Sequence, residues 1–333
     1  MLMKQIISAI SIFILVLPEN SYSAKPIKVG FWNVENLFDL EDDPTINDDE
    51  YALGGRKNVT KEIYNLKLKQ LSEVLDKMQA DVLGLCEVEN RSVLEELNQV
   101  TKTNYSIVHY DSPDNRGIDV ALLYDASKLT VMYSKPITVT LPNGYPTRDI
   151  LYVQGEMENN EIHLFINHWP SKYGGAKKTI PLRAAAGKTL RKQIEKILLK
   201  TSNAEIIVMG DLNDEPNDPS VNMHLGATMD LKEVGHQDKI LWNVMEPLHR
   251  NKKGSTYKYN GKDMVYDHLI VSLGLTDNFG LSLVENSVNI FDGEKYRQTG
   301  GKYDGYPFRF WAGKRLLGGY SDHMPVFLLV QPK

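Results

Sequence analysis

Residues 205–213 read EIIVMGDLN: four consecutive apolar side chains, a glycine, and then Asp211, Leu212 and Asn213. A short apolar run that ends in glycine and polar residues is typical of a buried β-strand. Polar groups that gather at the ends of sheet strands can converge on one rim of the sheet. This stretch therefore predicts both a strand and a polar site at its end.

The same arrangement recurs at other strand-like runs along the chain. The polar residues are Asn33 after residues 29–32, Glu87 after 82–86, Asn167 and His168 after 162–166, and Asp322 and His323 before 324–330. Carboxylate and amide oxygens without thiolates suit a hard divalent cation. Together these clusters predict a metal site at one rim of a sheet.

Helices and strands alternate along most of the chain. Helical periodicity marks residues 61–78, 91–100 and 183–200. Strand-like runs cover residues 27–32, 82–86, 105–109, 118–124, 129–139, 148–157, 161–167, 205–209, 263–271 and 324–330. This mixed order, with hairpin signals in the middle, predicts an α/β or α+β fold in which sheets pack on each other.

The chain shows no internal repeat, low-complexity tract or linker. Residues 41–57 read as a loop with Asn33 in a polar turn before it, and residues 275–320 are the least regular segment. We therefore predict a single domain over residues 25–333.

The N-terminus has the pattern of a signal peptide. Lys4 precedes an apolar run over residues 6–17, and the small residues of 21–24 follow. We predict that residues 1–24 are removed on export and that the mature protein is periplasmic or extracellular. Cys86 is the only cysteine, so an intramolecular disulfide is excluded. The formal net charge of −5 argues against a protein that holds nucleic acid by bulk electrostatics alone.

Each cluster taken alone has an ordinary structural explanation. Asp211 and Asn213 fit an Asx turn or a helix cap, and His168 fits a hydrogen-bonded structural residue. The run Ser321-Asp322-His323 also fits part of a Ser–His–Asp hydrolase, but adjacent residues of an extended chain point to opposite faces. The order and combination of the clusters favour one shared metal-dependent centre.

In that combination the chain resembles the endonuclease/exonuclease/phosphatase family. The matching motifs are Trp32-Asn33-Val34-Glu35-Asn36, Leu85-Cys86-Glu87-Val88, Asn167-His168, Gly210-Asp211-Leu212-Asn213, Tyr266-Asp267-His268 and Ser321-Asp322-His323-Met324-Pro325-Val326. They occur in the family's order over nearly the whole mature chain. The resemblance implies a four-layer α/β/β/α sandwich with two packed mixed, largely antiparallel sheets and the site at one rim.

The resemblance also implies a divalent metal and a set of groups around it. It makes Glu87 the principal Mg²⁺ ligand, with Mn²⁺ or Ca²⁺ as alternative ions. Asn33 and Asp322 lie beside the metal, directly or through water. Asp211 orients or deprotonates the attacking water, and Asn213 holds a phosphate oxygen.

The remaining predicted groups act on the proton and on the phosphate. His323 pairs with Asp267 and acts as a base or as an electrostatic partner. His168 faces the phosphate, where it stabilises charge or protonates the leaving oxygen. Arg148 resembles a phosphate-contacting arginine of the deoxyribonuclease branch. Asp119 is a further candidate, as the carboxylate partner of His168.

The family does not fix the substrate. The Tyr266-Asp267 pair resembles the deoxyribonuclease branch, and the signature of the inositol phosphatase branch is absent. A phosphodiesterase or nuclease is therefore the leading hypothesis, with nucleic acid as the partner and a monomeric enzyme. A sphingomyelinase-like lipid phosphodiesterase, a phosphomonoesterase and a catalytically silent binding protein are the alternatives.

Two segments bear on the substrate. The aromatic residues of 303–311 could stack on bases, dock on a membrane, or only fold a loop over the sheet edge. The basic residues near them, Arg297, Lys302, Arg309, Lys314 and Arg315, could lie near phosphates. Arg183 is a further candidate for a phosphate contact.

Overall fold

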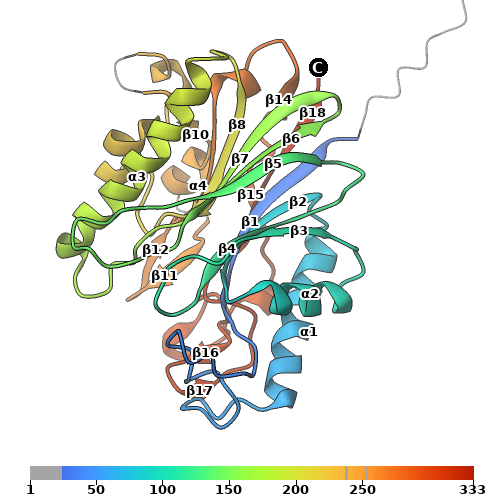
Figure 1. The fold of residues 1–333 in the computed structure, drawn as a ribbon, viewed down its shortest axis with the longest axis vertical. Helices are drawn as coiled ribbons and strands as arrows, with labels where there is room; N and C mark the ends of the chain where they lie inside the picture. The colour runs from blue at the N-terminus through green and yellow to red at the C-terminus, as the bar shows by residue number, and fades with distance from the viewer. Residues whose placement is uncertain (1–24, 237–238, 252–253) are drawn as a thin grey trace, which may run out of the picture.

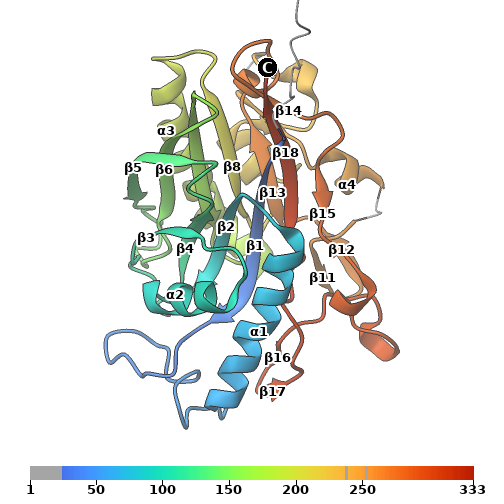
Figure 2. The same cartoon turned by 90° about the vertical axis from the view of Figure 1, so that its right-hand side faces the viewer.

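The computed structural model describes residues 25–236, 239–251 and 254–333. The predicted signal peptide, residues 1–24, lies outside the described residues. Two large sheets pack face to face, with helices on their outer faces (Figures 1 and 2). The predicted four-layer α/β/β/α sandwich with two mixed, largely antiparallel sheets is confirmed. Among the described residues, no helix combines the length and apolarity needed to cross a bilayer.

The first sheet is built around β1 (Ile27–Leu37). This strand pairs in parallel with β2 (Val82–Val88) and antiparallel with β18 (Val326–Pro332). The strand order is β14-β18-β1-β2-β4-β3, with β15 also paired to β18. The other strands of this sheet are β3 (Ser106–His109), β4 (Asp119–Tyr124), β14 (Leu281–Leu283) and β15 (Asn289–Ile290).

The second sheet has the parallel pair β7 (Asn160–His168) and β8 (Glu205–Asp211) near its centre. Its strand order is β5-β6-β7-β8-β13-β10-β9. The other strands are β5 (Thr130–Ile137), β6 (Ile150–Met157), β9 (Ala227–Thr228), β10 (Leu241–Asn243) and β13 (Asp267–Val271). Because β7 and β8 are parallel, their carboxyl ends meet at one edge of the sheet.

The apolar side chains of strand β8 are divided between two hydrophobic cores. Successive side chains of a strand point to opposite faces. Ile207 and Met209 belong to the core between the sheets, whereas Ile206 and Val208 belong to the core beneath helix α3 (Ala176–Leu198). A Cβ atom at Gly84 would lie 2.7 Å from the sulfur of Met209, so glycine permits the close approach of the two sheets at this point.

Helices α1 (Lys61–Met78) and α2 (Arg91–Val100) begin and end at the predicted residues. Thr60 caps α1 by accepting from the amide of Ile63, and Asn90 caps α2 by accepting from the amide of Val93. Both helices lie beside the first sheet (Figure 2), and α1 contributes Leu71 and Leu75 to the core between the layers.

The remaining elements are short. They are α4 (Glu246–Asn251), the hairpins β11–β12 (Tyr257–Tyr259 and Lys262–Met264) and β16–β17 (Trp311–Ala312 and Arg315–Leu316), a π-helix (Ser220–Leu225) and 3₁₀ turns (Leu231–Glu233, Leu273–Leu275, Glu294–Tyr296 and Gly301–Tyr303). Several lie in the segment predicted to be least regular.

The structure departs most from the predicted bounds in three elements, while several other strands differ by one to a few residues at their ends. β1 does not end in a turn at Asn33 but continues as an irregular strand to Leu37. The predicted strand over 263–271 is divided into β12 and β13. Helix α3 begins before residue 183 and contains Pro181, which breaks helices in most contexts. Near it, the hydroxyl of Thr179 and the guanidinium of Arg183 both donate to the carbonyl of Ala176 in the first turn.

Candidate active site

The polar residues at the strand ends meet at one end of the two sheets, the lower end in Figure 1. In the second sheet, His168 and Asp267 both lie in register with Asp211. From the first sheet, the side-chain amide of Asn33 donates to Asp211 Oδ2 and to Glu87 Oε1, each at 3.1 Å. Asn33 therefore joins the two sheets at the centre of the site.

His323 lies between two carboxylates. Its Nδ1 atom is 2.7 Å from Asp267 Oδ2, and its Nε2 atom is 3.7 Å from Asp211 Oδ2. The ring of Tyr257 stacks on the imidazole with centroids 4.6 Å apart, and the indole of Trp32 donates to the His323 carbonyl. Burial opposes the charged imidazole, but Asp267 and Asp211 outweigh it and raise the pKa of His323 well above its ordinary value. The ring is therefore fixed in orientation and favours its charged form.

His168 occupies the opposite side of Asp211. Its Nε2 atom is 3.8 Å from Asp211 Oδ2 and 3.9 Å from Glu87 Oε1. Burial and the positive charges of Arg148 and Arg116 hold the pKa of His168 well below its ordinary value. A neutral imidazole at this point can donate one N–H to an oxygen of a bound phosphate.

The predicted pairing of Asp119 with His168 is wrong. The Asp119 carboxylate lies 3.0 Å from Nε2 of His109 and accepts from the amide and hydroxyl of Ser112. Asp119 is the first residue of β4, and His109 is the last residue of the neighbouring strand β3. The imidazole of His109 therefore occupies the position beside the carboxylate. Arg116 is exposed in the turn before β4 and forms an ion pair with Asp114.

Bulges in β1 and β2 aim the side chains of this centre. The pairing register shifts between Asn33 and Leu37 in β1, and between Cys86 and Val88 in β2. Within these irregularities, Glu35 and Glu87 have φ values of 53° and 62°, which are unfavourable for residues with a Cβ atom. Such strained positions cluster at functional sites, where the surrounding structure maintains them. The bulges therefore point to a functional constraint at these strand ends.

The centre concentrates negative charge. Burial raises the pKa of Asp211 to about 7, with Asp267 adding to the shift and the nearby His323 opposing it. Burial and the neighbouring Asp322 likewise raise the pKa of Glu35 to about 7. Buried carboxylates that are insufficiently compensated by the protein are stabilised by a bound cation.

The oxygen ligands needed for a divalent cation are present. Glu87, Asp322 and Asn33 offer carboxylate and amide oxygens, which Mg²⁺ and Ca²⁺ prefer. In the described part of the chain, Asp267 Oδ1 and His168 Nδ1 are buried without a hydrogen-bond partner. Such groups are characteristic of catalytic sites that are completed by an ion, water or substrate. The donor set therefore fits a divalent metal.

A compact group of His/Asp ligand atoms lies beside this set. One atom each of Asp211, Asp267 and His323 lies within 4.8 Å of the others. Since Asp267 and His323 already bond to each other, we assign this group to proton handling and Glu87, Asp322 and Asn33 to the metal.

Asp322 is connected to the loop that carries the predicted aromatic segment. Its Oδ2 atom lies 3.0 Å from the guanidinium of Arg309. The buried carboxylate of Glu35 accepts from the backbone amides of Phe310 and Trp311, at 2.6 and 2.9 Å. Glu35 therefore holds the loop that positions Arg309 against Asp322.

Arg148 and Asn213 both contact the backbone that follows β7. The guanidinium of Arg148 donates to the carbonyls of His168 (3.2 Å) and Trp169 (2.6 Å) and to Asp114 (3.1 Å). The side-chain amide of Asn213 donates to the Trp169 carbonyl at 3.0 Å. These bonds place both side chains at the centre and orient His168, while their direct contact with a phosphate stays a prediction.

Arg183 does not face the substrate side. It is only 1% exposed, and its Nε atom lies 2.6 Å from Asp214 Oδ2. Asp214 also pairs with Lys172 at 2.9 Å and accepts from the hydroxyl of Ser220. The prediction of a phosphate contact is wrong because the guanidinium anchors α3 to the segment that follows Asp211.

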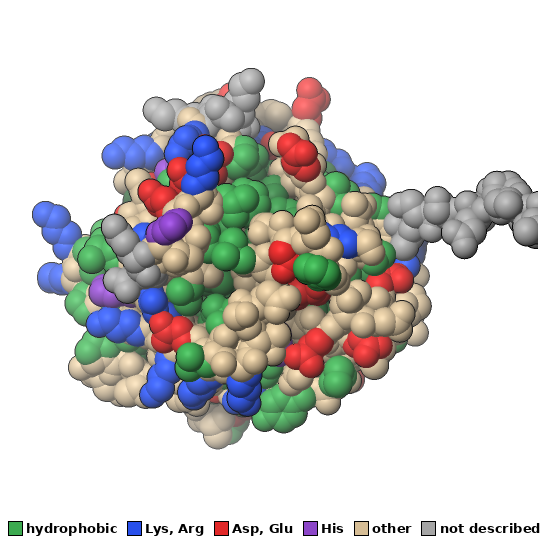
Figure 3. Space-filling model, turned by 90° about the horizontal axis from the view of Figure 1, so that it is seen from above, with side chains coloured by type: hydrophobic (Ala, Val, Ile, Leu, Met, Phe, Trp, Pro, Cys, Tyr) green, Lys and Arg blue, Asp and Glu red, His purple; other side chains and the backbone are tan. Residues whose placement is uncertain are grey.

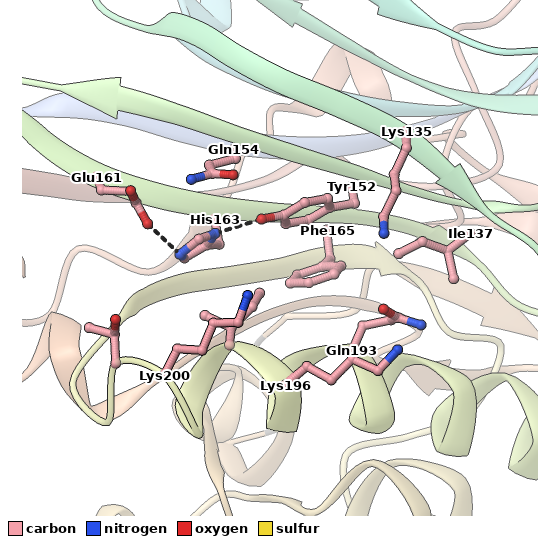
Figure 4. A pocket seen from close by; sticks show the side chains of 12 residues that line it. Lys135, Ile137, Tyr152, Gln154, Glu161, His163, Phe165, Gln193, Lys196 and Lys200 are labelled. Carbon is pink, nitrogen blue, oxygen red and sulfur yellow. Dashed lines mark hydrogen bonds and ion pairs between the residues drawn. The ribbon is translucent and has the colours of Figure 1, made fainter.

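A separate pocket lies between strands β5–β7 and the end of α3 (Figure 4). Its volume is about 260 Å³, and none of the predicted catalytic residues lines it. Within it, His163 bonds to Tyr152 and Glu161. The view from above, at the end of the molecule opposite to the catalytic candidates, shows lysine and arginine side chains gathered mainly on the side that carries α3 (Figure 3). Because no predicted catalytic residue lines this pocket, it is distinct from the catalytic centre.

Comparison with known proteins agrees with this geometry. Residues 28–332 match the Endonuclease/Exonuclease/phosphatase family. The chain belongs to this family. It is therefore a hydrolase that acts on phosphate esters and depends on a divalent metal.

Solved structures with low sequence identity share the fold. The catalytic domain of human Nocturnin, with bound sulfate, is 15% identical with a TM-score of 0.57, and the match covers 92% of this chain and 95% of that one. A family protein from Bacteroides thetaiotaomicron gives the same four values. TDP2 from D. rerio, complexed with single strand DNA product, is 15% identical with a TM-score of 0.54 and coverages of 92% and 99%.

Glu35 and Tyr257 have no predicted place in this site, and Arg309 is predicted only as one of the basic residues that could lie near phosphates. Glu35 belongs to a recognised motif, and its position two residues after Asn33 was an available signal. Tyr257 and Arg309 reach the centre only through the tertiary fold, from a short hairpin and a long loop. No local pattern connects these two residues with His323 or Asp322.

Proposed function

We propose that the protein is an exported, Mg²⁺-dependent phosphodiesterase of the nuclease type that hydrolyses P–O bonds by attack of water. The observation that carries this proposal is the position of Asp211, which lies between the Nε2 atoms of His168 and His323 and accepts from Asn33. A carboxylate between two imidazoles can accept a proton from water while both rings face the phosphate.

The metal would be held by Glu87 and Asp322, with Asn33 beside it. When bound, it stabilises the negative charge that develops on the phosphate oxygens. The strained backbone of Glu87 supports this role, because its carboxylate is aimed by a bulge and by the amide of Asn36 at 3.0 Å.

The protein groups divide the proton and charge transfers. Asp211 orients the attacking water and removes its proton. Asp267 fixes the ring of His323, whose positive charge faces the phosphate. His168, as a neutral ring, donates a hydrogen bond to a phosphate oxygen or to the leaving oxygen, which takes up its proton from solvent. Asn213 and Arg148 keep the adjoining backbone in place.

Nucleic acid is the substrate class that we favour. The D. rerio TDP2 structure of the same fold holds single strand DNA product, which supports a nuclease-like reaction for this chain. Docking on a lipid surface is less well supported, because the apolar rings of Phe310 and Trp311 are buried against Phe38 and Tyr51. Export to the periplasm or outside the cell is supported by the signal-peptide pattern of residues 1–24.

The test is hydrolysis by the purified protein of a panel with and without Mg²⁺. The panel contains single- and double-stranded DNA, RNA, sphingomyelin vesicles, sugar phosphates and bis(4-nitrophenyl) phosphate. We expect turnover of diesters that EDTA abolishes and Mg²⁺ restores. Turnover of phosphomonoesters alone, or of sphingomyelin alone, would replace the nuclease assignment, and binding without turnover would indicate a silent member of the fold.

A further inference from the structure

A groove of about 860 Å³ adjoins the catalytic centre. One wall is the β11–β12 hairpin, and the other is the loop over residues 298–317. Its lining includes Asp322, the predicted metal ligand, so the groove opens directly onto the place of the scissile phosphate. We call it the tyrosine groove, after Tyr257, Tyr259, Tyr303 and Tyr306, which line it.

The two walls are connected by the rings themselves. The hydroxyl of Tyr306 accepts from the amide of Gly261 at 2.6 Å, which joins the loop to the hairpin. The rings of Tyr303 and Tyr306 are perpendicular, with centroids 5.3 Å apart. Tyr303 and Tyr259 remain 47% and 57% exposed. Aromatic rings with an exposed face, carried by two walls that are hydrogen-bonded to each other, are suited to stacking on planar groups.

Cations alternate with these rings. Lys258 lies over the ring of Tyr306 at 5.3 Å, and Lys302 lies over the ring of Tyr303 at 5.4 Å. Within the described residues, Lys302 and Arg315 have no carboxylate within ion-pair distance, whereas Lys258 pairs with Asp263. Uncompensated cations beside ring faces attract a ligand that carries several phosphates and planar groups.

The groove is continuous with the reacting atoms. Tyr257 lines the groove and stacks on His323, and Arg309 lines it and pairs with Asp322. A ligand that occupies the groove therefore extends from the phosphate bound at the centre. This placement distinguishes the groove from the pocket of Figure 4, which no catalytic candidate lines.

We infer that the tyrosine groove binds the bases and phosphates of a single-stranded nucleic acid on one side of the scissile phosphate. This inference rests on the proposed function and specifies its substrate. Bases of a duplex are stacked on each other and do not offer their faces, whereas unpaired bases do. A lipid headgroup would use the cations but not a row of exposed tyrosine faces, and the exposed rings carry polar hydroxyl groups.

The test combines binding and turnover with matched variants. Tyr303→Ala and Lys302→Ala are compared with Tyr133→Ala and Lys200→Ala, whose side chains are exposed away from the groove. Binding of a fluorescent single-stranded 12-mer and of its duplex is measured by anisotropy in EDTA, where turnover is absent, and binding to sphingomyelin vesicles is measured by co-sedimentation. Steady-state kinetics are measured with the same 12-mer, with its duplex and with bis(4-nitrophenyl) phosphate.

We expect Tyr303→Ala to weaken single-strand binding by about tenfold, since loss of one stacked base costs on the order of 1–3 kcal/mol. KM for the 12-mer should rise by a similar factor, and this rise should exceed any change with the small diester by about tenfold. Lys302→Ala should reduce the salt dependence of binding by about one counterion. The two control variants should bind and react as the wild type does.

The outcomes separate this inference from the proposed function. Equal effects of Tyr303→Ala on the 12-mer and the small diester would overturn the inference while leaving a phosphodiesterase. Tighter binding of the duplex than of the single strand, or binding only to sphingomyelin vesicles, would overturn it as well. Single-strand binding that depends on Tyr303, without hydrolysis of any substrate, would support the groove and refute the proposed function.

Discussion

The Nδ1 atom of His323 and the Oδ2 atom of Asp267 lie 2.7 Å apart, and Asp267 is completely buried. Asp267 is the first residue of β13 and His323 lies just before β18, so the pair joins an element of the second sheet to one of the first. Because Asp267 occupies Nδ1, only Nε2 of His323 is available toward Asp211. Asp267 therefore sets the tautomer of the ring and the direction of Nε2, while Tyr257 packs on the ring face.

Asp267→Asn should lower kcat on bis(4-nitrophenyl) phosphate by on the order of 10²- to 10⁴-fold, because the amide cannot stabilise the charged ring and can impose the wrong tautomer. KM should change little, since Asp267 does not reach the substrate. Circular dichroism and thermal unfolding verify that the isosteric variant folds. Asp277→Asn, at the opposite end of the sheets, serves as the control. Retention of more than half of the wild-type kcat would remove Asp267 and His323 from the mechanism.

Glu87→Gln should lower the affinity of the protein for its divalent metal by at least about tenfold, because a charged oxygen ligand is replaced by a neutral one. The Mg²⁺ concentration that gives half-maximal activity should rise accordingly. Calorimetric titration with Mn²⁺ in the absence of substrate measures the same loss independently of turnover. Glu95→Gln, on the exposed face of α2, is the control. An unchanged Mn²⁺ affinity would assign the metal to other ligands.

Much of this fold was predictable because each element carries its own local signal. The helix at 61–78 has both an apolar periodicity and a capping Thr60, and β8 alternates between two cores while ending on Asp211. The strand ends that form the centre could also be predicted, because polar residues follow apolar runs. The predictions that were wrong concern residues whose partners are set by the tertiary fold. The carboxylate of Asp119 is taken by His109 from a neighbouring strand, and Arg183 is buried by Asp214.

The continuation of β1 past Asn33 shows the same limit. A polar run after apolar residues normally predicts a turn. Here Glu35 and Asn36 instead adopt positive φ values within the strand. The Glu35 carboxylate is held by the amides of Phe310 and Trp311, which lie 275 and 276 residues away in the sequence. A bulge that is stabilised by a distant loop leaves no periodic signal, although it positions Asn33 and Glu87.

Arg183→Met should lower the free energy of unfolding by about 3 kcal/mol, because it leaves the buried carboxylate of Asp214 without its closest cation. Lys172 and Ser220 remain beside Asp214 and limit the loss. Urea unfolding of Arg183→Met, Asp214→Asn and the double variant measures the coupling, which should exceed about 1 kcal/mol. Arg91→Met, which removes an exposed ion pair with Glu95, should cost less than about 1 kcal/mol. Additive effects of the two buried substitutions would show that the pair does not stabilise the fold.

Glu205 makes the stability of the protein depend on pH. Its carboxylate lies at the start of β8, far from the catalytic centre, and accepts from the amide of Leu281. Burial raises its pKa to about 7, with Asp277 adding to the shift and Lys333 opposing it. Because the folded state binds this proton more tightly than the unfolded chain, the contribution is complete at acidic pH. It is lost as the pH rises from the ordinary carboxyl range through about 7.

Glu205→Gln removes this titration while keeping the shape and the acceptor oxygen. The variant should be more stable than the wild type by about 1–2 kcal/mol at pH 8.5 and similar to it at pH 5, after allowance for partial solvation. Urea unfolding at both pH values measures the difference, and Glu156→Gln on the exposed face of β6 controls for the loss of one negative charge. A difference between Glu205→Gln and the wild type that is the same at both pH values would show that Glu205 does not titrate on unfolding, and a loss of stability at pH 8.5 would show that its charged form is stabilising.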